Sequence, residues 1–313
     1  MPKLFRLFVV LTLLLLPAPA FAWNGRGHMT VAHIAYTSLP APTRSRVDAL
    51  LRQHPDFARL SQGLNQNSST FGLRVFMVAA TWPDIIKTDG RFHEDNQPAT
   101  PLRPGFPSMK RHRNWHFIDM PFTQDGSQTA QPPSPNALEI MPQLRQSIGN
   151  NSVSASEQAY NLSWLIHLVG DVHQPLHATA RFTRLHGRPD GDRGGVLFLV
   201  NDSAGALHFV WDDALGTATA FNSVRALGNA LAAENAPENP VNTDEQDWIN
   251  DSFAIAQESV YTLGQDYRVT PQGLRPRKPS ISAAYRNTAT RISRKQVALA
   301  GRRLAAIIEE RLP

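Results

Sequence analysis

The sequence predicts a mainly α-helical protein built as one domain. Apolar residues recur at helical spacing in segments spread along the chain, and stretches rich in Pro and Gly separate these segments. No internal repeat or linker divides the sequence. Residues 23–313 also stay within the ~250–300 residues over which a single hydrophobic core can grow.

Residues 1–22 have the pattern of a cleaved signal peptide. Lys3 and Arg6 form a basic start, 7–16 is an apolar run, and Ala20-Phe21-Ala22 offers small residues for processing after Ala22. A membrane anchor is the alternative, but the apolar run is shorter than the ~20 residues that span a bilayer. We therefore expect a mature chain that begins at Trp23, is secreted or periplasmic, and has no membrane anchor.

The composition limits how an exported chain of this kind can be stabilised. It contains no cysteine, so its rigidity must come from packing and from metal. The leader holds two of the 31 basic residues and none of the 26 acidic ones, so its removal lowers the formal net charge from +5 to +3. This small excess of positive charge favours the binding of polyanions but identifies no partner.

Five segments carry the apolar repeat of helices that pack on a core. In the fourth, Ala159, Leu162 and Ile166 keep one face apolar. The last is amphipathic with Arg and Lys on its other side, which leaves a membrane or nucleic-acid face open. Packing on the core is favoured, because ordinary surface helices share this pattern. The expected helices are 30–38, 44–51, 71–81, 157–169 and 292–312.

The remaining segments are expected to form loops and one small flap. Residues 88–109 and 121–135 are too rich in Pro and polar side chains for regular structure. Gly and Arg dominate 181–195. The next two segments, 196–201 and 206–210, combine β-branched and apolar residues and predict a small β-hairpin.

The densest group of chemically active side chains lies between residues 167 and 177. His167 and Asp171 are four residues apart at the end of an expected helix, so both point to the same side. Pro175 interrupts the helix and lets His177 turn back toward a second metal. Imidazole and carboxylate in combination suit zinc best.

Other segments add donors of the same kind. Any one of them alone is more often an ordinary hydrogen-bonded side chain. Burying the whole set without cations would cost several kcal/mol for each unpaired charge, so a metal centre is the favoured interpretation. After cleavage, the amine and carbonyl of Trp23 would join His28 as donors. The added side chains are His28, Asp84, His116, His208 and Asp212.

The order of these motifs resembles the exported, zinc-dependent single-strand nucleases and 3′-nucleotidases of the S-one/P-one type, to which the zinc phospholipases C are structurally akin. The resemblance includes Trp-Pro-Asp at 82–84, His-Phe-Ile-Asp at 116–119 and two His-x3-Asp pairs. It implies a single helical phospholipase C/nuclease-like domain over residues 23–313, with three Zn2+ ions in a cleft.

The resemblance also implies how the ligands divide among the three zincs. The first zinc would take Asp84, His116, His167 and Asp171. The second would take His177, His208 and Asp212. The third would take the amine and carbonyl of Trp23, His28 and the second oxygen of Asp171, which thereby bridges two ions.

Catalytic and substrate-binding roles follow from the same resemblance. Asp84, Asp171 and Lys87 would act at the scissile phosphate, where Lys87 neutralises developing charge; an ordinary surface lysine is the alternative. Phe117 would stack on a nucleobase and Asp119 would accept hydrogen bonds from its edge. The alternative for Phe117 is a core aromatic next to a metal ligand. Val196 stands where the family usually has Asn, and its side chain cannot hydrogen-bond a base. The loop that carries Arg181, Arg184, His186, Arg188 and Arg193 could supply phosphate contacts instead, and a solvated basic loop is the equal alternative.

The first hypothesis is therefore a zinc-dependent endonuclease that hydrolyses single-stranded RNA and DNA to 5′-phosphate products and removes 3′-phosphate from nucleotides. Its partners would be single-stranded nucleic acids and nucleotides, with no obligate protein partner. A zinc-dependent phospholipase C is the second hypothesis, and assays on RNA and phosphatidylcholine separate the two. The third is a zinc-binding protein without catalysis.

Overall fold

The computed structural model describes residues 23–235 and 241–313, and the chain is mainly α-helical, as the sequence predicts. The expected signal peptide, residues 1–22, lies outside the described residues. The longer helices are α1 (Gly25–Ser38), α2 (Ala41–Leu51), α4 (Phe71–Ala79), α6 (Ala137–Ser147), α7 (Ala155–Asp171), α9 (Phe221–Glu234), α10 (Glu245–Ile255) and α11 (Ala283–Arg311). The short helices are α3 (Phe57–Leu60), α5 (Trp82–Ile86), η1 (Arg113–His116), η2 (Pro175–His177), α8 (Leu207–Asp212) and η3 (Ala256–Val260).

All five expected helices are present, and capping residues set the start of three of them. The side chain of Asn24 accepts hydrogen bonds from the first turn of α1, so this helix begins at Gly25. Ser154 and Ser282 cap α7 and α11 in the same way. The terminal helix consequently begins well before the expected residue 292, because Ser282 supplies a start signal that apolar spacing alone does not mark.

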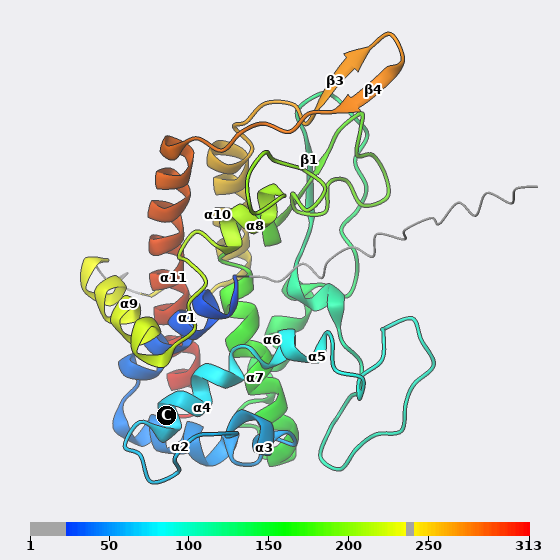
Figure 1. Ribbon diagram of the computed structural model, residues 1–313. Helices are drawn as coiled ribbons and strands as arrows, with labels where there is room; N and C mark the ends of the chain where they lie inside the picture. The colour runs from blue at the N-terminus through cyan, green and yellow to red at the C-terminus, as the bar shows by residue number, and fades with distance from the viewer. Residues whose placement is uncertain (1–22, 236–240) are drawn as a thin grey trace, which may run out of the picture.

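The core is built around α1, α7 and α11, which lie side by side in Figure 1. α7 is completely buried from Leu162 to its end, so it carries its C-terminal turn into the centre of the molecule. α11 approaches α1 closely at Gly301, where an added Cβ would lie 2.6 Å from the Cβ of Ile34. No described helix is long and apolar enough to cross a membrane.

The predicted β-hairpin over 196–201 and 206–210 is wrong. The two segments share one isolated bridge, Leu199 to Ala206, and the second continues as helix α8. Leu207, Val210 and Trp211 are apolar because they form the buried face of that helix. A run this short does not distinguish a strand from a buried helix by its composition.

The two small sheets lie elsewhere. β1 (Met120–Thr123) pairs in parallel with β2 (Thr179–Phe182), so part of the expected loop 121–135 is a strand. β3 (Tyr267–Thr270) and β4 (Gly273–Pro276) form an antiparallel hairpin that projects from one end of the molecule (Figure 1).

Candidate active site

Imidazole and carboxylate side chains from helices far apart in the sequence meet in the buried interior. α1 supplies His28, and the last turns of α7 supply His167 and Asp171. The shorter helices bring the rest, and none of these side chains belongs to an exposed residue. Asp84 lies on α5, His116 on η1, His177 on η2, and His208 and Asp212 on α8.

The donor atoms form three groups in which all atoms lie within 4.8 Å of one another. The third group is the set that the resemblance assigns to the second zinc. The first two share His167, and together they contain the set implied for the first zinc, with His28 added. The groups are His28–Asp84–His167, His116–His167–Asp171 and His177–His208–Asp212.

Asp171 is the carboxylate that joins these groups. Its Oδ1 lies 3.3 Å from Nε2 of His28, and its Oδ2 lies 3.1 Å from His116 Nδ1 and from His167 Nε2. Burial pushes the pKa of Asp171 upward, but the attraction of His167 and His177 outweighs it and holds the pKa well below its usual range. Asp171 is therefore an anionic centre that faces two directions.

Main-chain carbonyls orient three of the rings. His167 Nδ1 lies 2.7 Å from the carbonyl oxygen of Ala80, and His208 Nδ1 lies 2.7 Å from that of Gly194. His177 Nδ1 is 2.6 Å from the carbonyl oxygen of His116. Because a carbonyl only accepts, each Nδ1 donates its proton and each Nε2 is left with a lone pair.

The donor set fits zinc. Two atoms that each lie ~2.0–2.1 Å from a tetrahedral zinc are ~3.3 Å apart. Two of the donor pairs match this value: His28 Nε2 to Asp171 Oδ1 is 3.3 Å, and His208 Nε2 to Asp212 Oδ2 is 3.4 Å. In addition, buried donor atoms that lack a hydrogen-bond partner within the described residues gather here. They belong to His28, His116, Asp171, His177 and Asp212.

Asp212 is a buried carboxyl whose surroundings disfavour the ionised form. Burial raises its pKa well above the usual range, Gln174 opposes this by a hydrogen bond, and repulsion from other carboxylates adds to it. Gln174 Nε2 donates to Asp212 Oδ1 at 2.7 Å, which leaves Oδ2 directed to His208. A bound cation would restore the carboxylate form.

Lys87 is buried rather than exposed on the surface. Its Nζ lies 2.7 Å from Oδ1 of Asp84, and only 4% of the lysine is exposed. Burial acts to raise the pKa of Asp84, but Lys87, followed by His167, lowers it to about 2. Arg113 donates to the Lys87 carbonyl at 3.0 Å and fixes the turn that carries it. An ordinary surface lysine does not have this environment.

Trp23 is completely buried against the start of α1. An added Cβ on Gly27 would lie 2.6 Å from the Cβ of Trp23, so the glycine makes room for this residue. Asn24 both caps α1 and donates through Nδ2 to Asp213 at 2.8 Å. The first described residue is therefore held beside the helix turn that contains His28.

A pocket of about 320 Å³ adjoins this centre, and the two residues expected to bind a base line it. Phe117 and Asp119 follow His116 directly, and Ile118 between them donates to the His177 carbonyl at 2.8 Å. Burial, with repulsion from Asp192, raises the pKa of Asp119 well above its usual range. The sequence does not single out most of the other lining residues, which are Asn114, Ala130, Gln131, Pro133, Ala180, Phe182, Pro189, Asp190 and Arg193.

The loop at 183–195 is held by a buried ion cluster. Arg181 is completely buried and lies 3.1 Å from Asp266, so it is not available to bind phosphate. Asp192 accepts hydrogen bonds from the amides of Arg181 and Gly195, at 2.9 and 3.1 Å. These bonds fix the turn whose Gly194 carbonyl orients His208. Val196 is not among the residues that line the pocket.

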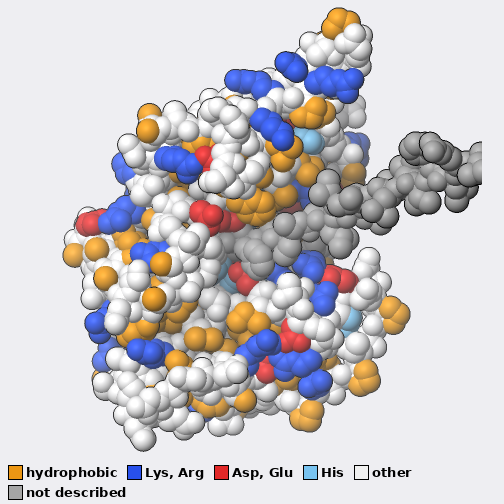
Figure 2. Space-filling view, viewed as in Figure 1, with side chains coloured by type: hydrophobic (Ala, Val, Ile, Leu, Met, Phe, Trp, Pro, Cys, Tyr) orange, Lys and Arg blue, Asp and Glu red, His pale blue; other side chains and the backbone are white. Residues whose placement is uncertain are grey.

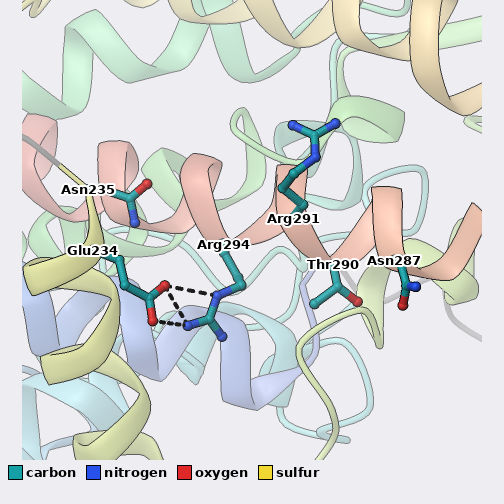
Figure 3. A pocket seen from close by; sticks show the side chains of 6 residues that line it. All are labelled: Glu234, Asn235, Asn287, Thr290, Arg291 and Arg294. Atoms are coloured by element: carbon teal, nitrogen blue, oxygen red, sulfur yellow. Dashed lines mark hydrogen bonds and ion pairs between the residues drawn. The ribbon is translucent and has the colours of Figure 1, made fainter. Parts of the chain in front are cut away.

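A second pocket, of about 330 Å³, lies between α9 and α11 (Figure 3). Its charged groups are largely paired: Arg294 donates to both carboxylate oxygens of Glu234, with distances of 2.6 Å from Nη2. No candidate metal ligand lines it. The basic side of the terminal helix is thus partly an ion-paired surface, and its apolar side packs on the core.

Comparison with known proteins agrees with the geometry. A model of the S1/P1 nuclease family matches residues 23–313, nearly the whole chain. A search of curated proteins found no match. Proteins of this family are zinc-dependent, typically secreted nucleases, and the buried histidine and aspartate groups suit such an enzyme. The chain belongs to the S1/P1 nuclease family and is a hydrolase of nucleic-acid phosphodiester bonds.

Proposed function

We propose that the mature protein, residues 23–313, is a secreted or periplasmic endonuclease that cleaves single-stranded RNA and DNA to 5′-phosphate products and also removes 3′-phosphate from nucleotides. The observation that carries this proposal is the pocket containing Phe117 and Asp119, which adjoins the buried donors through the shared segment 116–119. A phosphodiester at the metal centre would therefore have its own base within reach of the pocket.

Phe117 and Asp119 would contact different parts of a nucleobase. Phe117 offers a ring on which any base can stack, worth ~1–3 kcal/mol, and Asp119 offers an acceptor for base-edge amino groups. A base paired in a duplex presents neither its face nor its edge to such a pocket. Single strands are consequently the preferred substrate.

Three zinc ions would be held by the donors described above. We assign Asp84, His116, His167 and Asp171 to the first, His177, His208 and Asp212 to the second, and Trp23, His28 and Asp171 to the third. Bound zinc would act as a Lewis acid on phosphoryl oxygens and would lower the pKa of a water molecule bound to it toward ~7. Asp171 would contribute to two of these sites, and Lys87, whose ammonium lies beside Asp84, would neutralise charge that develops on the phosphate.

The decisive experiment measures zinc content and substrate preference of the same preparation. We expect close to three zincs per chain, turnover of single-stranded RNA and DNA, 5′-phosphate ends, and little cleavage of duplex. Phe117→Ala and Asp119→Asn should raise KM for a dinucleotide while leaving zinc content unchanged. Turnover of phosphatidylcholine in place of RNA would favour a phospholipase C, and stoichiometric zinc without any turnover would favour a non-catalytic protein.

The role of Trp23 has its own test. Its α-amino group becomes free only if processing occurs after Ala22, which lies outside the described residues. A protein with a tag before Trp23 should bind less zinc and turn over more slowly than one that begins at Trp23, with the fold retained. Proteolytic removal of the tag should restore both. Equal zinc content and rate in the two forms would exclude the amine as a ligand.

A further inference from the structure

The β3–β4 hairpin and the two residues after it form a strongly basic projection, which we call the basic arm (residues 267–278). The arm contains no acidic residue. Figure 2 shows Lys and Arg side chains gathered on this projection and on the surface just beneath it. The basic residues of the arm, all exposed, are Arg268, Arg275, Arg277 and Lys278.

Two of these arginines face each other. Arg268 and Arg275 are register partners in the antiparallel pair, so their side chains leave the same face of the hairpin. Directly opposed residues of this kind have Cβ atoms ~4.5–5.5 Å apart, and like charges there destabilise the pair. Within residues 23–235 and 241–313, no ion pair joins either guanidinium to a carboxylate. The hairpin thus carries an uncompensated repulsion that an anionic ligand would relieve.

The arm is fixed to the strand that lines the base pocket. Asp266, which precedes β3, is buried and lies 3.1 Å from Arg181 on β2 and 3.4 Å from His186. Ala180 and Phe182 of the same strand line the pocket, whereas Arg181 points to the opposite side, as alternate strand residues do. The arm therefore starts directly behind one wall of the pocket.

A second anchor fixes the direction of the arm. The hydroxyl of Tyr267 donates to Asp125 at 2.8 Å, and the same carboxylate accepts from the Arg184 amide at 2.9 Å. The start of β3 is therefore tied to the turns after β1 and β2. A strand of this length extends roughly 14 Å, at ~3.4 Å per residue, beyond these anchors.

We propose that the basic arm binds the phosphates of a single-stranded polynucleotide where the strand continues beyond the nucleotide held in the pocket. This inference rests on the proposed use of the pocket for a nucleobase. Cationic side chains along a projecting strand suit a phosphate backbone, whose binding is sequence-independent. An anionic membrane surface is less suited, because Val269 is the arm's only large exposed hydrophobic side chain and the Tyr267 hydroxyl is already bonded.

Direct binding tests the arm independently of catalysis. The zinc-loaded protein is titrated into a fluorescein-labelled phosphorothioate oligonucleotide, long enough to reach past the pocket, and anisotropy gives Kd at several salt concentrations. The double variant Arg268→Ala/Arg275→Ala should bind roughly tenfold more weakly, and its salt slope should fall by about 1.4, which is ~0.7 for each lost phosphate contact on a single strand. Arg268→Lys/Arg275→Lys, which keeps both charges, should bind within about twofold of the parent.

A matched control distinguishes the effect of the arm's arginines from the effect of a lower net charge. Arg44→Ala/Arg46→Ala removes two arginines from α2, at the opposite end of the molecule in Figure 1, and should leave Kd and the salt slope unchanged. If this control weakens binding as much as the arm variant, or if the arm variant binds like the parent, the proposal is overturned. An arm variant that loses binding only to phosphatidylglycerol vesicles would overturn it as well.

Kinetics then distinguishes this inference from the proposed function. The arm variant should raise KM for a long single strand and leave kcat and KM for a dinucleotide unchanged, because a dinucleotide is too short to reach the arm. Wild-type protein that binds the oligonucleotide through the arm but cleaves neither substrate would contradict the proposed function alone. Wild-type protein that cleaves both, with an arm variant equal to it on the long strand, would contradict the arm alone.

Discussion

Asp171 illustrates how much one carboxylate determines at this centre. Its two oxygens face different histidines, and three imidazoles lie within 3.3 Å of them. We predict that Asp171→Asn is the most damaging single change, because the amide keeps the shape but loses the charge on which both neighbouring sites depend. Zinc content measured by mass spectrometry should fall by more than one ion, with activity. A milder effect than that of His28→Ala would contradict a bridging role.

The Lys87 prediction depends on a buried contact. The ammonium neutralises Asp84 in the structure and would face the phosphate next to it in a complex. Lys87→Ala should lower kcat by ~10²–10³, the range for losing one transition-state donor, with zinc content kept. Lys87→Arg, which keeps the charge, should recover part of the loss. An unchanged kcat would show that Lys87 only stabilises the fold.

At the scale of single residues, the sequence identifies the candidate metal ligands better than the residues that surround them. The His167/Asp171 spacing and the repeated pair His208/Asp212 are recognisable because a helix places i and i+4 on one side. The remaining lining of the base pocket is not predictable, since Asn114 and Gln131 line it together with Ala180 and Phe182, which are far from them in the sequence. The sequence also offers Arg181 for phosphate binding, because nothing in its local context reveals complete burial.

Among the elements, the start of α1 makes a specific prediction. Alanine is a better helix former than glycine by ~1 kcal/mol, yet a Cβ on Gly27 would collide with Trp23. Gly27→Ala should therefore displace Trp23 and lower zinc stoichiometry while the protein stays folded. Gly90→Ala is the control, since a Cβ there meets nothing within 4 Å. Full zinc content in the Gly27 variant would show that Trp23 does not contribute to the metal site.

The loop at 88–109 makes a pH-dependent contribution through Glu94. Hydrogen bonds from Arg113, opposed in part by burial and aided by Arg111, lower the pKa of Glu94 to about 2. Because this lies below the unfolded value of 4.5, the ionised carboxylate stabilises the fold above pH ~4.5 and loses that effect as the pH falls toward 2.

Glu94→Gln should accordingly reduce the free energy of unfolding at pH 7, with a smaller difference from the parent at pH 3. Urea unfolding at the two pH values measures this. Glu309→Gln, at the exposed end of α11, serves as the control and should change the free energy of unfolding by less than ~0.5 kcal/mol, as is usual for a surface substitution. A Glu94 difference that is equal at both pH values would exclude the ionised carboxylate as its source.

Elements are predictable where periodicity is long and uncertain where it is short. Five of the longer helices follow from their apolar repeats, and three of these begin earlier than expected, at the capping residues Asn24, Ser154 and Ser282. Helices α6, α9 and α10 are not among the expected helices. Helix α8 resembles a strand in sequence because a run of six residues that is mostly apolar or aromatic satisfies either pattern. The parallel pairing of β1 with β2 joins residues far apart in the chain and leaves no local signal.

At the scale of the whole molecule, zinc binding and folding should be coupled. The donors come from elements spread between residues 28 and 212, so each bound ion ties distant segments together. Chelation should abolish activity and lower the melting temperature together, because a ligand that binds only the folded state stabilises it. Calorimetry before and after zinc removal tests this, and re-addition of zinc should reverse both effects. An unchanged melting temperature would mean that packing alone holds the centre.

The carbonyl contacts to the histidine rings have a consequence for how this enzyme can change over evolutionary time. The acceptors for His167, His177 and His208 belong to the main chain, which every substitution leaves in place. Asp212, in contrast, is aimed by the side chain of Gln174, which a single codon change can remove. Natural variation at position 174 can therefore alter the orientation of Asp212. The orientation of the three imidazoles depends on main-chain carbonyls, so substitutions of the surrounding side chains affect it less.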